Sequence, residues 1–229
     1  MRARRSSAPA AILVPLLVLV LAVALWRALT GDAAGPARGE ASGGAAEALA
    51  ALPVREAASS AGYQRTRFGS SWVDVDDNGC RTRDDVLLRD LDDVRLAPDG
   101  CTVLSGTLQD PYSGDEIAFR RGEDTSADVQ IDHVVALAAA WRTGAQGFSE
   151  DERVRFANDP LELLAVDGPL NGAKGDDDAS QWLPPEGECE YVARQVAVKS
   201  AWGLWVTPAE HDAMAGVLAG CPGQELPAP

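Results

Sequence analysis

Two adjacent residues near the middle of the chain, Asp132 and His133, are of the types that hydrolytic enzymes use to bind metals and transfer protons. They stand inside VQIDHVVAL, residues 129–137, an apolar stretch that predicts a buried strand. An imidazole titrates near neutrality, so His133 is suited to act as a general base. The alternative for these two residues is a satisfied polar pair at the end of a strand.

Two asparagines and a lysine follow this pair. Asn158 comes shortly before a second apolar stretch, LELLAV at residues 161–166, and Asn171 opens the sequence NGAKG, which contains Lys174. The layout is therefore a strand that carries Asp-His, a long connection, an asparagine before a second strand, and NGAK at the start of a helix.

These elements, DHVVAL, NDPLELLAV and NGAKG, resemble the ββα-metal motif of the HNH, or His-Me finger, endonucleases. Further stretches, among them YVARQVAVK and GLWVTPAE, are similar to exported HNH proteins related to the nuclease domain of GmrSD-type restriction enzymes. The likeness covers nearly all of residues 63–218. It implies an α+β fold, in which a β-hairpin region precedes the ββα-metal core and helices follow it.

The resemblance also implies a role for each residue. His133 would be the general base, and Asp132 and Asn171 would hold the metal, for which an asparagine oxygen favours Mg²⁺ or Mn²⁺ over zinc. Asn158 would orient the loop that holds His133, or else be a turn residue or helix C-cap. Lys174 would hold the scissile phosphate or be a solvated helix residue.

The activity that this implies is hydrolysis of phosphodiester bonds in nucleic acid, with DNA expected ahead of RNA and a 5′-phosphate and 3′-hydroxyl as products. One alternative is a catalytically inactive, calcium-stabilised extracellular binding domain on an HNH scaffold, and another is an exported toxin or competence factor with the same nuclease chemistry. The net charge of −15 opposes a nuclease, because proteins that grip nucleic acid neutralise phosphates with Lys and Arg. We assume a monomer.

A second cation site is suggested by DVDDNGCRTRDD, which has the residue spacing of an EF-hand loop with Asp in place of the final Glu. Its candidate calcium ligands are Asp74, Asp76, Asn78 and Asp85. An acidic, solvated turn is the alternative. Arg81 and Arg83, in the same stretch, are candidates to approach the backbone of a nucleic acid.

The N-terminal segment predicts export. Three arginines precede an uncharged, apolar run from Ser6 to Trp26, so residues 1–33 are a cleaved signal peptide or an uncleaved anchor that would tether the protein to a membrane. Residues 34–62, rich in Ala, Gly, Glu and Ser, predict a flexible linker, and residues 63–229 the nuclease domain. The expected location is extracellular or at the cell surface.

The four cysteines predict disulfides, because an even count is typical of exported domains and none has the C-x-x-C spacing of a zinc or redox site. Three pairings are open. Local hairpin and helix contacts favour Cys80 with Cys101 and Cys189 with Cys221.

Hydrophobic spacing and capping signals predict the remaining elements. They are a short helix ending near Leu91, a hairpin of residues 101–108 and 117–121, and helices starting near Glu150, Tyr191 and Thr207. His211 lies in the last of these helices, beside Asp212, and we interpret it as a surface residue.

Overall fold

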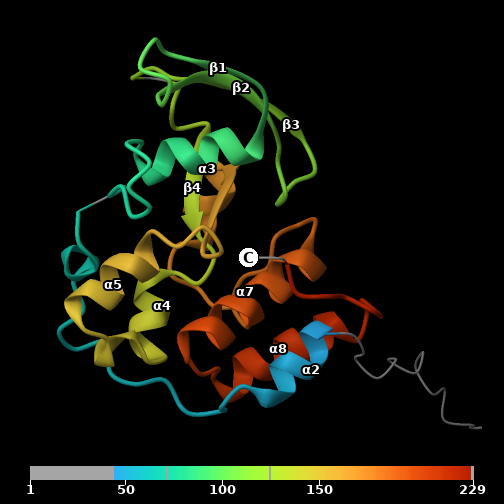
Figure 1. The fold of residues 1–229 in the computed structure, drawn as a ribbon. Helices are drawn as coiled ribbons and strands as arrows, with labels where there is room; N and C mark the ends of the chain where they lie inside the picture. Colours follow the sequence, from blue (N-terminus) through green and yellow to red (C-terminus); the bar gives the residue numbers. More distant parts are fainter. Residues whose placement is uncertain (1–43, 71, 124, 228–229) are drawn as a thin grey trace, which may run out of the picture. The chain divides into compact units, whose positions relative to one another are not determined.

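The computed structural model describes residues 44–70, 72–123 and 125–227 (Figure 1). The N-terminal segment predicted as signal peptide or anchor, residues 1–33, lies outside these ranges. Within them, no helix combines the length and apolar character needed to cross a membrane. The elements in chain order are α2 (Gly44–Ala51), η1 (Arg65–Phe68), α3 (Thr82–Asp90), β1 (Leu91–Leu96), β2 (Val103–Gln109), β3 (Glu116–Arg120), β4 (Val129–His133), α4 (Leu137–Arg142), η2 (Ala145–Gly147), α5 (Glu150–Ala157), β5 (Leu163–Asp167), α6 (Gly168–Lys174), α7 (Glu188–Trp202) and α8 (Pro208–Leu218).

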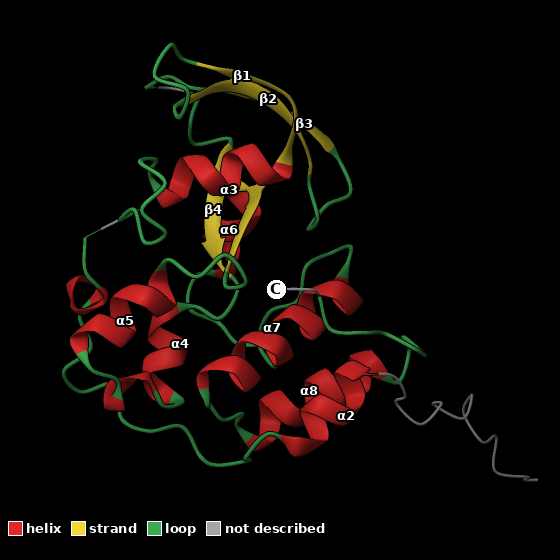
Figure 2. Cartoon of the chain, in the orientation of Figure 1, coloured by secondary structure: helices red, strands yellow, loops and turns green. Residues whose placement is uncertain are grey.

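The predicted ββα unit is present. Strands β4 and β5 pair antiparallel, with His133 opposite Leu163. Helix α6 follows β5 at once and lies beside the two strands (Figure 2). Its start is set by Asp167, whose side chain accepts a hydrogen bond from the backbone N–H of Leu170 at 2.7 Å. The expected α+β architecture with a ββα core is therefore confirmed.

The N-terminal hairpin region is larger than predicted. β2 and β3 form the expected hairpin, but β1 adds a third antiparallel strand in the order β1-β2-β3. β1 begins at Leu91, a residue that the sequence had placed in the preceding helix. Strand β4 is also shorter than predicted, because the chain turns after His133 and residues 137–142 form α4.

Helix α3 joins the three-stranded sheet to the ββα unit. It lies between β1–β3 and β4–β5 (Figure 1) and buries Val86 and Leu87 there. The core at this junction contains side chains from both sheets, including Leu108, Phe119 and Leu163. This packing holds the β4–β5 sheet, which carries Asp132 and His133, against α3 and the three-stranded sheet.

A second core surrounds α7 and corrects the predicted linker. Helix α2, which falls inside residues 34–62, packs Ala45 and Leu49 against α7 and α8. Val54 also forms a parallel β-bridge with Val206. From Gly44 onward these residues are therefore part of the domain rather than of a flexible linker. The alanine-rich composition, which suggested disorder, here forms an amphipathic helix.

Both predicted disulfides are confirmed. Cys80, just before α3, is bonded to Cys101 in the turn between β1 and β2. Cys189, in the first turn of α7, is bonded to Cys221 after α8. The helices predicted to start near Glu150 and Thr207 are present, and a capping box at Ser149 and another at Thr207 begin them.

If α2 belongs to the domain, truncating its buried leucine must destabilise the whole fold. Leu49→Ala should lower the free energy of unfolding by about 2–5 kcal/mol, the usual cost of emptying a buried leucine site. Urea unfolding followed by circular dichroism measures this loss. Glu47→Ala, an exposed change in the same helix, is the control. Equal stability of the two variants would mean that α2 belongs to a flexible linker and not to the domain.

Candidate active site

His133 occupies the last position of β4, and the backbone of another element fixes its ring. Its side chain is buried, and Nε2 lies 3.0 Å from the carbonyl oxygen of Ala157, at the end of α5. A carbonyl can only accept, so in the neutral ring Nε2 carries the proton. Nδ1 then keeps its lone pair, and no hydrogen bond of the described residues uses that atom.

The imidazole is held neutral. Burial, and then the charges of Arg65 and Lys174, lower the pKa of His133 to about 3, although the hydrogen bond to Ala157 opposes the shift. At neutral pH the ring is therefore unprotonated on Nδ1, the nitrogen whose lone pair is free.

Asn158 connects three parts of the site. It ends α5, and its amide Nδ2 donates to the Val154 carbonyl at 2.9 Å. Its Oδ1 accepts from the backbone N–H of Val73 at 3.1 Å. Asn158 follows the carbonyl that holds His133, so its side chain fixes that carbonyl relative to the segment around Val73. Asn158 is therefore the C-cap that the sequence allowed, and its orienting role toward the loop that holds His133 stays a prediction.

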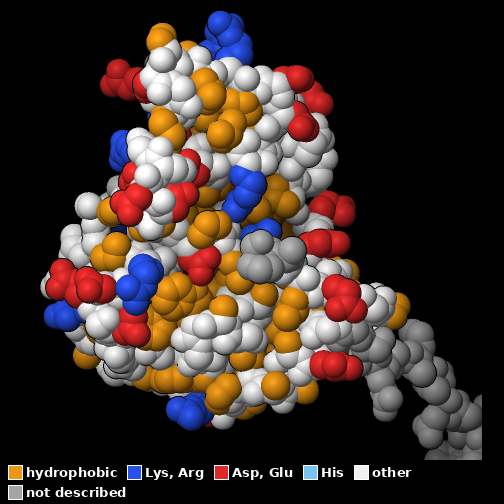
Figure 3. Space-filling model, viewed as in Figure 1, with side chains coloured by type: hydrophobic (Ala, Val, Ile, Leu, Met, Phe, Trp, Pro, Cys, Tyr) orange, Lys and Arg blue, Asp and Glu red, His pale blue; other side chains and the backbone are white. Residues whose placement is uncertain are grey.

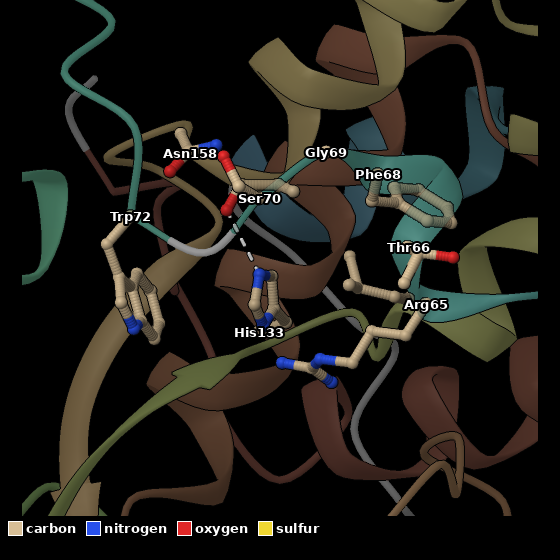
Figure 4. Close-up of a pocket in the computed structure, with 10 residues that line it drawn as sticks. Arg65, Thr66, Phe68, Gly69, Ser70, Trp72, His133 and Asn158 are labelled. Atoms are coloured by element: carbon tan, nitrogen blue, oxygen red, sulfur yellow. Dashed lines mark hydrogen bonds between the residues drawn. The ribbon is translucent and has the colours of Figure 1, made fainter.

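The segment held by Asn158 places Trp72 over His133. The two rings are nearly parallel, at 18°, with centroids 6.0 Å apart. Trp72 has a φ of 61°, a left-handed conformation that is strained for a bulky residue. Gly69 allows the chain to pass close to α5, because a Cβ at this position would lie 2.7 Å from Val154 Cγ2. Figure 4 shows His133 between Trp72 and Arg65.

Asp132 points to the other side of β4 into a buried polar network. Its Oδ1 accepts from Lys174 Nζ at 2.9 Å, and its Oδ2 accepts from the Tyr112 hydroxyl at 2.6 Å. Lys174 also donates to the His133 carbonyl at 2.8 Å and is fully buried. The prediction of a phosphate contact or a solvated residue at Lys174 is therefore wrong, because its ammonium is taken up inside the domain.

The carboxyl of Asp132 is under opposing influences. Burial raises its pKa, whereas Lys174 and the Tyr112 hydroxyl lower it. Removing one partner of such a pair leaves the other as an uncompensated buried charge, which is strongly destabilising. The pair therefore fixes α6 to the end of β4.

Asn171 lies in the middle of α6 and reaches the same cavity as Asp132. Its Nδ2 donates to Gln130 Oε1 at 2.9 Å, which directs the amide along the wall formed by β4. Its Oδ1 accepts no hydrogen bond from the described residues. Asp132, Asn171 and His133 all line this polar cavity, which has a volume of about 350 Å³.

These donors fit a metal that takes few protein ligands. Each carboxylate oxygen of Asp132 has one partner, so lone pairs remain on it, and Asn171, whose Oδ1 is also free among the described residues, lines the same cavity. Mg²⁺ commonly binds through one or two such oxygens and keeps several waters. The described residues contain no group of three His, Cys, Asp or Glu side chains that could hold a metal.

Another buried acid, Glu162, supports the turn after β4. Its Oε2 accepts from the backbone N–H of Val135 at 3.2 Å, and its own carbonyl accepts from Val134 N–H at 2.9 Å. Burial raises its pKa well above the usual value, which favours the neutral form of the side chain. Its role is to turn the chain out of β4 directly after His133.

The candidate calcium loop is closed by its own hydrogen bonds. Asn78 Nδ2 donates to Asp76 and to Asp85, each at 3.1 Å, and Asp74 accepts from Gly79 N–H at 2.9 Å. Burial and then the neighbouring carboxylates raise the pKa of Asp85, while Asn78 opposes this. The predicted ligands are thus adjacent, but calcium binding stays a prediction.

A thermal shift tests the calcium loop. Millimolar Ca²⁺ should raise the Tm of the wild type, because a ligand that binds only the folded state stabilises it, and Asp74→Ala should abolish the gain. Asp115→Ala, an exposed change in another turn, is the control. The loop is a solvated acidic turn if the Tm of the wild type does not move.

The pKa of His133 predicts an acid sensitivity. Its folded value, about 3, lies below the ordinary 6.5, so the unfolded chain binds the proton more tightly. The stability that comes from keeping His133 neutral is therefore fully present above pH 6.5 and is lost as the pH falls toward 3. When the pH falls from about 7 to about 4.5, the free energy of unfolding of His133→Gln should fall by about 2–3 kcal/mol less than that of the wild type.

His211→Gln is the matched control, because His211 is the other histidine and lies on α8 with a partly exposed side chain. Urea unfolding at both pH values gives the free energy of unfolding of the wild type and of each variant. An acid sensitivity that His133→Gln leaves intact would mean that the imidazole is not held neutral.

Several residues of the site carried no signal in the sequence. Tyr112 stands in a polar turn, and Arg65 and Trp72 lie in a segment without a motif. An aromatic residue in an otherwise polar turn was the one visible hint at Tyr112. Arg83 lines the cavity and Arg81 does not, although the sequence treated them alike.

Comparison with known proteins agrees with this arrangement. The family model described as "GmrSD restriction endonucleases, C-terminal domain" matches residues 81–217, which include β4, β5 and α6. The chain is 37% identical over 178 residues to an "Uncharacterized secreted protein" of Arthroderma benhamiae, covering 76% of this chain and 82% of the relative. No solved structure matches. The chain thus belongs to the family of the C-terminal domain of GmrSD restriction endonucleases, as the HNH resemblance of its motifs predicted.

Proposed function

We propose that this protein is an exported, metal-dependent endonuclease in which His133 is the general base. The observation that carries the proposal is the hydrogen bond between His133 Nε2 and the Ala157 carbonyl, at 3.0 Å. It assigns the proton to Nε2 and leaves Nδ1 as the acceptor, in a ring that is neutral at physiological pH.

In this reaction Nδ1 removes a proton from the water that attacks the phosphorus. The bond from phosphorus to the 3′ oxygen breaks and that oxygen takes a proton from solvent, which by family resemblance leaves a 5′-phosphate and a 3′-hydroxyl. Asn158 maintains the geometry, because it fixes the α5 terminus that holds the imidazole. It is a positioning residue in this proposal.

Asp132 and Asn171 would hold the divalent cation, with Mg²⁺ or Mn²⁺ as the expected ion. When bound, the ion would stabilise negative charge on the phosphate and on the leaving oxygen. Lys174 and Tyr112 support this by holding both oxygens of Asp132. In place of the phosphate contact predicted from sequence, we propose that Lys174 positions the carboxylate.

Two observations support an extracellular location. The Arthroderma benhamiae relative is described as secreted, and both disulfides are of the kind that persist outside the cytoplasm. Cleavage of the N-terminal segment and tethering to a membrane remain predictions.

The activity is tested by nicking of supercoiled plasmid DNA, and of RNA in parallel, with Mg²⁺, Mn²⁺ or EDTA. Wild type should cut with a divalent ion, and His133→Ala should lose about 10²–10⁴ of the rate, the usual contribution of a general base. His211→Ala should cut as wild type does. Failure to cut either nucleic acid with any ion, or an active His133→Ala, contradicts the proposal and favours the inactive binding domain.

The metal ligand is better tested at Asn171 than at Asp132, because Asp132→Ala would leave Lys174 buried without its partner. Asn171→Ala should lower activity through metal affinity, so that higher Mn²⁺ restores part of the rate. His133→Ala should gain nothing from added metal, since its defect is in proton transfer. If added Mn²⁺ restored Asn171→Ala and His133→Ala to the same degree, the assignment of Asn171 as metal ligand and His133 as general base would be contradicted.

A further inference from the structure

We propose that the site binds an unpaired nucleotide, with its phosphate between Arg65 and Arg83 and its base in the adjoining cavity beside His133. Single-stranded or locally unpaired nucleic acid is then the preferred ligand. This inference rests on the proposed function for nucleic acid as the ligand and adds the form in which that ligand is bound.

The phosphate position follows from two guanidinium groups without acidic partners. Arg65 and Arg83 line the polar cavity of about 350 Å³ that also contains His133. In the part of the chain that the structure describes, neither forms an ion pair. Arg83 makes one long hydrogen bond, 3.4 Å, to the Val129 carbonyl.

The cavity is therefore positive in an acidic protein. The charge of Asp132 is compensated by Lys174, which leaves the two arginines in excess. Arg83 is half-buried, and burial lowers its pKa, so an anion beside it would relieve an unfavourable environment. The planar guanidinium matches the oxygens of a phosphate, and the charge-assisted bonds formed are strong ones.

The base position follows from a second cavity that shares a wall with the first. It has a volume of about 240 Å³ and is lined by Phe68 and Trp72 among others. At ~30 Å³ per water molecule this equals about eight waters, roughly the heavy atoms of a nucleobase. Arg65, Trp72 and His133 line both cavities, so a nucleotide could occupy the two together. Trp72 stacks on His133 and also lines this cavity, so its indole is the ring on which a base would stack.

A base inside a duplex cannot enter this cavity without leaving its stack. Charge adds to this preference, because duplex DNA carries one negative charge per ~1.7 Å. The protein has a net charge of −15, and its Lys and Arg side chains form separate spots on the face in Figure 3. A short unpaired segment brings fewer phosphates against this surface than a duplex does.

The test is binding without metal, so that cleavage does not interfere. Fluorescence anisotropy in EDTA compares one labelled sequence as single-stranded DNA, single-stranded RNA and DNA duplex, together with a strand of equal length made of abasic units. A single strand should bind about tenfold or more tightly than the duplex, and the abasic strand no better than the duplex. The ratio of DNA to RNA affinity identifies which of the two strands fits.

Variants separate the two halves of the site. Trp72→Ala should lose the preference for a single strand, and Trp72→Phe should keep most of it, because stacking needs a ring. Arg65→Gln and Arg83→Gln should weaken the normal and abasic strands alike and each lower the salt slope by about 1. Arg95→Gln, an exposed change on β1, is the control.

The inference is overturned if duplex binds as tightly as single strand, if the abasic strand binds as well as the normal one, or if Trp72→Ala keeps the preference. These results are distinct from failure of the proposed function. A protein that nicks plasmid but shows no single-strand preference remains a nuclease and lacks this site. One that binds as predicted but never cuts retains the site and is not a nuclease.

Discussion

The alternation of side chains along β4 is the constraint on which the site depends. Adjacent residues of a strand point to opposite faces, so Asp132 and His133 cannot share one set of partners. The structure provides a different support for each face. α6 and the turn before β3 hold the carboxylate through Lys174 and Tyr112, and the end of α5 holds the imidazole through the Ala157 carbonyl. Each residue is fixed by an element on its own side, and both line one cavity at the end of the strand.

This arrangement also accounts for the polar groups in the interior. Lys174, Asp132 and Glu162 are almost fully buried, which is costly unless each is paired or neutralised. Lys174 and Asp132 pair with each other, and burial raises the pKa of Glu162 well above its usual value, which favours its neutral form. The positive charges that remain at the cavity, on Arg65 and Arg83, lack acidic partners among the described residues. An acidic protein thereby keeps a local positive site for an anion.

The ββα core could be predicted from sequence because its signals are local. The apolar runs, the spacing of Asp132, His133, Asn158 and Asn171, and the capping residues all lie within continuous segments. The disulfides could be inferred because each joins cysteines close in the sequence, 21 and 32 residues apart.

The partners of these residues could not be predicted, because they come from distant segments. Tyr112 reaches Asp132 from the turn between β2 and β3, and Trp72 is brought over His133 by a hydrogen bond between Val73 and Asn158, 85 residues apart. Lys174 shows the same limit. A lysine near a helix end is ordinarily solvated, and only the tertiary structure places it against a buried carboxylate. Helix α2 was missed because its alanines bury little surface by themselves and depend on α7 and α8 for a partner.

The claim at the centre of this account is that His133 is neutral and carries its proton on Nε2. Nitrogen-15 NMR of the imidazole groups measures this directly, since the chain has two histidines and His211→Gln assigns them. At about pH 5, where an ordinary imidazole is mostly charged, His133 should show a protonated Nε2 and an unprotonated Nδ1, while His211 serves as the internal comparison. An imidazolium at His133, or a proton on Nδ1 with Nε2 free, would contradict its assignment as a general base held by Ala157.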